Sequence, residues 1–205
     1  MTGEDAYRWL MDASRIASAD PFDVHVVASI LALAIAEVGM GKSLGDGAGL
    51  SAPELGVLAM MLFPPAADDL GALSGMEAPV IDTEEQSLRD ILLMYASGPD
   101  GLIKPLAFLI ARRCSFPNHL WQDLGLRNRG ELSRLMQTHF AGLSRRNSGD
   151  MKWKKFLYRM VCSTEGFTLC TAPVCSECAD FEVCFGAEDG DALLARLRNG
   201  KMVPA

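Results

Sequence analysis

The chain has 205 residues, of which 49% are hydrophobic and 22% charged, and its formal net charge is −7. This composition is typical of a globular protein with one sizeable core, and it argues against a disordered or membrane-embedded chain. The N-terminus is acidic, and the longest apolar run, Val24 to Ala36, is too short to span a bilayer. We therefore expect a cytoplasmic protein with no secretory signal and no membrane partner.

Helical periodicity and helix-capping residues run through the chain, and no segment has the alternation of a strand. The first helix is predicted over residues 4–17. Asp20 and Pro21 are typical of a helix start, and they predict a second helix that reaches about Val38. Apolar residues surround this second helix on all sides, so we expect it to lie at the centre of the fold.

A glycine-rich loop is predicted from Gly39 to Gly49, with the sequence Gly-Met-Gly-Lys-Ser at its start. A phosphate-binding loop needs an earlier glycine where Ala36 stands, and it follows a strand. Nucleotide binding is therefore not expected here.

Capping residues and stop signals define the other helices. Ser51 and Thr83 each begin a capping-box pattern, and a loop is predicted over 141–149. The predicted limits are Ser51 to Pro64, 66–73, Thr83 to Gly98, 102–113, Asn118 to Gly125, Asn128 to His139, Asp150 to Cys162, and 190–199. The expected fold is all-α: a globular domain of about seven to nine helices with a C-terminal cysteine-rich metal-binding loop.

Basic residues are concentrated in residues 112–159, which hold eleven of the nineteen Lys and Arg but only three acids. Several of them flank an apolar stripe on the helix that begins near Asp150: Lys152, Lys154, Lys155 and Arg159. The aromatic residues lie on the stripe rather than among the charges, and the whole protein is acidic, so nucleic acid is not an expected partner. We expect this helix to hold an anion or an anionic cluster, or to dock an acidic partner, with a solvated surface as the alternative.

Four of the six cysteines fall within fifteen residues, in the spacing C-x4-C-x2-C-x5-C: Cys170, Cys175, Cys178 and Cys184. Cytosolic thiols stay reduced, so the cluster indicates metal binding rather than disulfides. Zinc sites usually combine two close cysteine pairs, whereas only one C-x2-C pair occurs here. The spacing favours an iron–sulfur cluster and leaves a structural zinc site with four cysteine ligands as an alternative. The predicted organisation is a helical domain (1–161), the cysteine-rich segment (162–186) and a tail with a short helix (187–205).

Among the other cysteines and histidines, Cys162 and His119 each allow two interpretations. Cys162 is either a fifth ligand or a small residue that helps its helix pack. His119 lies four residues before Asp123, so the pair is either an oriented imidazole that binds metal or takes a proton, or a buried structural hydrogen bond. Cys114 is expected in the core, and His139 is expected as a favourable charge at a helix C-terminus.

Three stretches resemble the NifQ family of nitrogenase cofactor assembly: Asn118 to Leu126, Asp150 to Phe156, and the cysteine block with Phe185 and Gly186. The resemblance is dense from about residue 105 to 186. It implies an iron–sulfur protein that acquires molybdenum and donates it during synthesis of the iron–molybdenum cofactor, as a carrier rather than a turnover enzyme.

The resemblance also implies that the cluster is held by Cys170, Cys175, Cys178 and Cys184. The implied recipients are the nitrogenase cofactor scaffold complex and the nitrogenase reductase component, and the basic helix would attract molybdate. On the residues alone, an electron-transfer iron–sulfur protein and an interaction module with structural zinc remain alternatives.

Overall fold

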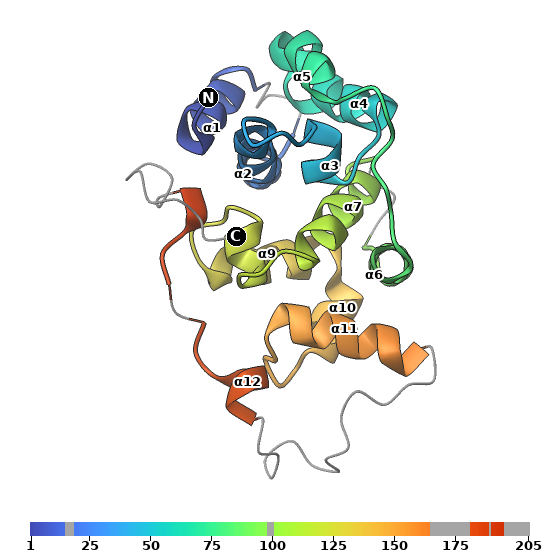
Figure 1. The fold of residues 1–205 in the computed structure, drawn as a ribbon. Helices are drawn as coiled ribbons and strands as arrows, with labels where there is room; N and C mark the ends of the chain where they lie inside the picture. The colour runs from blue at the N-terminus through green and yellow to red at the C-terminus, as the bar shows by residue number, and fades with distance from the viewer. Residues whose placement is uncertain (15–18, 98–100, 165–180, 189, 195–205) are drawn as a thin grey trace.

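The computed structural model describes residues 1–14, 19–97, 101–164, 181–188 and 190–194 (Figure 1). Within these ranges every regular element is helical, which confirms the all-α prediction. The elements are α1 (Gly3–Asp12), α2 (Pro21–Val38), α3 (Leu44–Ala48), α4 (Ala52–Leu62), the 3-10 helix η2 (Pro64–Ala66), α5 (Ala67–Leu73), α6 (Thr83–Met94), α7 (Ile103–Cys114), α8 (Leu120–Asp123), α9 (Arg129–His139), α10 (Ala141–Arg146), α11 (Trp153–Thr164) and α12 (Phe181–Phe185).

The central helix is α2, as predicted. The Asp20 side chain accepts a hydrogen bond from the Phe22 backbone N–H at 2.7 Å, and Pro21 occupies the first turn. From Val24 to Ile35 every residue except His25 is buried, and α1 and α3 pack against the helix. By length and composition α2 could cross a membrane, but 67% of it is buried inside the protein. It is the core helix of this fold.

Polar side chains near the start of α2 connect it to α1 and α9. Asp23 Oδ1 lies 2.8 Å from Nε2 of His139, and both side chains are buried. His25 lies between the Tyr7 hydroxyl, 2.8 Å from its Nδ1, and Glu131, 3.2 Å from its Nε2. The expectation that His139 serves mainly as a helix-end charge was incomplete, because it is a buried partner of an acid from another helix.

Several boundaries differ from the prediction for local reasons. The first helix ends at Asp12 rather than at residue 17. Asp82 caps α6 in place of Thr83, and its side chain accepts from the Glu85 N–H at 2.7 Å. The helix predicted from Asp150 begins at Trp153, because Asp150 has a left-handed φ of 54° and its carboxylate binds Arg129 at 2.7 Å.

Three short α-helices of the described residues were not predicted. A capping box of Ser43 and Asp46 starts α3 inside the expected glycine-rich loop. The segment predicted as a loop over 141–149 contains α10, whose Gly142 packs closely against Tyr95. The third helix is α12, which carries Cys184. Of the helix predicted over 190–199, residues 195–199 lie outside the described residues.

Gly125 follows α8, and a substitution there tests its close contact with α2. Its φ is 71°, and a Cβ there would lie 2.8 Å from the backbone oxygen of Ser29 in α2. We expect Gly125→Ala to lower the free energy of unfolding by about 2 kcal/mol or more, because strain and a backbone clash combine. Gly56→Ala is the matched control: a Cβ at that position would have no neighbouring atom within 4 Å, and it should raise stability by about 0.5–1 kcal/mol. Urea unfolding measures both, and equal effects would contradict this account.

Candidate metal centre

Of the four clustered cysteines, the structure describes Cys184, while Cys170, Cys175 and Cys178 lie outside the described residues. The Cys184 carbonyl oxygen accepts a hydrogen bond from the Lys152 backbone N–H at 2.8 Å. Lys152 also donates from Nζ to the Glu182 carbonyl oxygen at 3.1 Å. These two bonds fix α12 beside the start of α11 (Figure 1). The Cys184 thiol is free and half-buried, which suits a residue that ligates metal near the surface.

The other two described cysteines lie elsewhere. Cys162 is ten residues beyond Lys152, so about 15 Å of helix separates it from the end of α11 that meets Cys184. The structure therefore does not bring Cys162 and Cys184 together. Cys114 is buried at the end of α7, and burial raises the pKa of its thiol to about 12. The expected core position of Cys114 is confirmed, and its thiol is neutral at physiological pH.

His119 occupies the N-cap of α8, where the prediction had Asn118. Its backbone N–H donates to Gln122 Oε1 at 3.2 Å, and Gln122 Nε2 donates to the Asp191 carbonyl oxygen at 3.0 Å. The predicted pairing of His119 with Asp123 is wrong. The Asp123 side chain is 1% exposed and accepts instead from Asn118 Nδ2 at 3.0 Å and from Lys154 Nζ.

The partner of His119 is Glu188, which was not predicted from the sequence. Glu188 Oε1 lies 3.4 Å from Nδ1 of the imidazole, and Oε2 accepts from Arg129 Nη1 at 2.5 Å. The Glu188 side chain is 5% exposed. At metal sites a carboxylate frequently lies beside the histidine ring nitrogen that does not bind the metal. Glu188 lies 69 residues from His119, so no local sequence pattern could reveal the pair.

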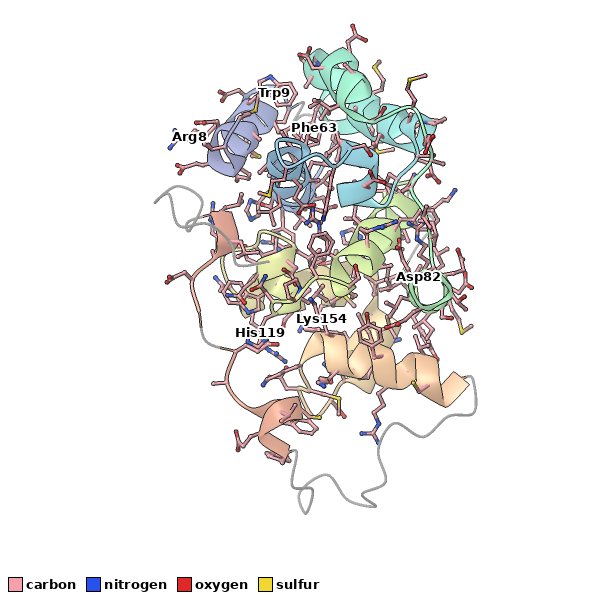
Figure 2. All side chains as sticks on the ribbon, viewed as in Figure 1. Arg8, Trp9, Phe63, Asp82, His119 and Lys154 are labelled. Atoms are coloured by element: carbon pink, nitrogen blue, oxygen red, sulfur yellow. The ribbon has the colours of Figure 1, made fainter. Side chains whose placement is uncertain are left out.

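A pocket of about 430 Å³ opens beside this pair, between α8, the start of α11 and α12. We call it the lysine pocket because three lysines line it. His119 and Lys154, both on its wall, are labelled in Figure 2. Its lining residues are Pro117, Asn118, His119, Leu120, Gln122, Lys152, Lys154, Lys155, Val183 and Glu188. Val183 precedes Cys184, so the lysine pocket is adjacent to one of the clustered cysteines.

The part of the chain that the structure describes contains no group of three or more His, Cys, Asp or Glu side chains placed to hold a metal ion. The chemistry of the four cysteine side chains is therefore the ground on which a metal cluster can be assigned. Four thiolates are the ligands that iron–sulfur clusters use, and the free, half-buried Cys184 is compatible with that role.

Comparison with known proteins identifies the family. The model of the NifQ family matches residues 26–186, from the first turns of α2 to just beyond Cys184. This chain belongs to the NifQ family. The match covers all four clustered cysteines and the residues of the lysine pocket except Glu188.

Individual NifQ proteins agree with this assignment. The NifQ homolog of Sinorhizobium fredii is 38% identical over 172 residues, covering 83% of this chain and 75% of the relative. NifQ of Rhodobacter capsulatus is 34% identical over 161 residues, or 73% of this chain and 89% of the relative. NifQ of Azotobacter vinelandii is 39% identical over 105 residues, about half of each chain. No solved structure matches.

Proposed function

We propose that this NifQ-family protein is an iron–sulfur protein that acquires molybdenum and donates it for synthesis of the nitrogenase iron–molybdenum cofactor. The observation that supports the proposal is the extent of the family match, which reaches residue 186 and so includes the whole cysteine motif. In this role the protein is a cytoplasmic metal carrier rather than a turnover enzyme, and molybdenum is its cargo.

The cluster ligands in this proposal are Cys170, Cys175, Cys178 and Cys184. A bound cluster would supply bridging sulfides, which are soft donors suited to a thiophilic metal such as molybdenum. The protein contributes the position of the motif: the Lys152 backbone holds Cys184 at the start of α11. Because Cys184 is half-buried rather than sealed in the core, a recipient protein could reach the metal.

The proposed recipients are the nitrogenase cofactor scaffold complex and the nitrogenase reductase component. A transfer experiment tests the proposal: anaerobic protein loaded with molybdenum is mixed with molybdenum-free scaffold, and the two are separated by size. We expect molybdenum to move to the scaffold fraction. Molybdenum that stays with this protein at every ratio of the two would contradict the donor role.

His119 is a further candidate ligand, with the Glu188 carboxylate beside its ring. We expect His119→Ala to retain its iron but to bind less molybdenum, by about half or more, because His119 lines the pocket beside the cysteine motif while the four thiolates are untouched. Iron and molybdenum per chain are measured together after anaerobic purification. His25→Ala is the matched control, since His25 is a half-buried histidine of the α1–α2–α9 contact. Unchanged molybdenum in the His119 variant would remove this residue from the site.

A further inference from the structure

The charges of the lysine pocket are unevenly compensated. Lys154 Nζ pairs with the buried Asp123 carboxylate and also donates to the Phe116 carbonyl oxygen. The carboxylate of Glu188 is paired with Arg129. Lys154 therefore leaves no free charge in the pocket, whereas Glu188 shares Arg129 with the Asp150 carboxylate and keeps part of its negative charge.

The other two lysines have no acidic partner among the described residues. Lys152 donates to a neutral group, the Glu182 carbonyl oxygen, and its ammonium keeps two further donors. Lys155 is exposed and makes no ion pair within the part of the chain that the structure describes. The lysine pocket thus presents two lysines without an acidic partner on one concave surface, and its positive charge exceeds the part of the Glu188 charge that Arg129 does not offset.

The N-terminus of α11 adds to the positive potential of the lysine pocket. Lys154 and Lys155 belong to the first turn of α11, which carries no acidic residue. Positive side chains at a helix N-terminus are unfavourable by about 0.3–1 kcal/mol each, because the helix dipole has its positive end there. A bound anion would interact favourably with the lysines and with the positive end of the helix dipole, and so would offset this unfavourable energy. The pocket volume of about 430 Å³ accommodates a small ion with several waters.

We infer that the lysine pocket is a docking site for a tetrahedral oxyanion of the molybdate class, bound by the ammonium groups of Lys152 and Lys155. Lysine ammonium groups bind oxyanions as mobile point charges and impose little geometry. His119 also lines the pocket, and the Lys152 backbone contacts Cys184. The oxyanion would therefore dock next to the cysteine motif before its metal is taken up. This inference rests on the proposed function for the identity of the natural ligand.

The inference is tested by equilibrium dialysis of molybdate against the full-length, anaerobically purified protein at low ionic strength. We expect the double variant Lys152→Gln/Lys155→Gln to bind molybdate at least about tenfold more weakly than the unmodified protein. Lys152→Arg/Lys155→Arg should bind within a few-fold of it, because both charges are kept. Sulfate, which has the same shape and charge, should compete for the site.

The matched control removes two positive charges from other surfaces, at Lys104 of α7 and Arg145 of α10. Lys104→Gln/Arg145→Gln should bind molybdate within about twofold of the unmodified protein, which separates the pocket from a general charge effect. Iron content and circular dichroism are recorded for each variant, so that a lost cluster or a lost fold is recognised.

Two results would overturn the inference: equal molybdate binding by the Lys→Gln double variant, or no molybdate binding by the unmodified protein at millimolar concentration. These results are distinguishable from failure of the proposed function. If the protein delivers molybdenum to the scaffold but the double variant binds molybdate normally, only the docking site is wrong. If the pocket binds molybdate as expected but no molybdenum reaches the scaffold, only the donor role is wrong.

Discussion

Replacing Cys178 with Ser is expected to remove most of the iron from the protein while leaving its helix content intact. A serine hydroxyl is a hard and poorly ionised ligand compared with a thiolate, so one corner of the cluster would lose its protein bond. The main buried cluster of the helical core runs from Ala6 to Val161 and precedes the cysteine motif, whereas Cys184 and Phe185 are only partly buried against it. Iron per chain and far-ultraviolet circular dichroism after anaerobic purification measure the two effects.

Cys114→Ala is the matched control for this experiment. Cys114 is buried, and its thiol stays protonated because burial raises its pKa to about 12. Removing it should leave the iron content unchanged and cost about 1 kcal/mol of stability from the lost packing. A collapse of helix content in Cys178→Ser would show that the cysteine motif is structural. Full iron retention in that variant would remove Cys178 from the ligand set.

Replacing Lys154 with Met is expected to lower the free energy of unfolding by about 3 kcal/mol or more. The Asp123 carboxylate is 1% exposed, and Lys154 is the positive group that binds it. Without the ammonium, the buried carboxylate would keep, among the described residues, its hydrogen bond from Asn118 alone. For a chain of this size, such a loss lowers the melting temperature by roughly 6–12 °C.

Lys155→Met removes the same charge from the neighbouring position and serves as control. Lys155 is exposed and has no ion pair among the described residues, so its replacement should change stability by less than about 0.5 kcal/mol. Adding Asp123→Leu to Lys154→Met should restore part of the loss, because the unpaired carboxylate is then gone. Thermal unfolding of the three variants measures these differences. Equal melting temperatures for the two single variants would contradict the structural role given to Lys154.

Helices with strong local signals were predicted well from the sequence. The start of α2 follows from Asp20 and Pro21, the start of α4 from Ser51 and Glu54, and the start of α9 from Asn128. Each of these caps acts within three residues, so the sequence alone contains the relevant interaction. The short helices α10 and α12 lack such signals. Their helical structure depends instead on packing against other parts of the chain.

The candidate site likewise combines features that the sequence predicted with contacts that it did not predict. The spacing of the four cysteines and the basic character of α11 were visible in the sequence, and both led to the expectation of a metal site beside an anion-binding surface. The contacts that shape the surface were not visible. Asp123 pairs with Lys154 and His119 with Glu188, across 31 and 69 residues respectively, and only the folded chain brings these groups together.

The central claim is that the cysteine motif holds an iron–sulfur cluster that carries molybdenum. Metal analysis with electron paramagnetic resonance, on protein purified without oxygen from cells supplied with molybdate, tests it most directly. We expect a brown protein that contains iron, with molybdenum present after growth on molybdate and a cluster signal that is lost in Cys178→Ser. Colourless protein that contains zinc alone, after strict exclusion of oxygen, would contradict the claim.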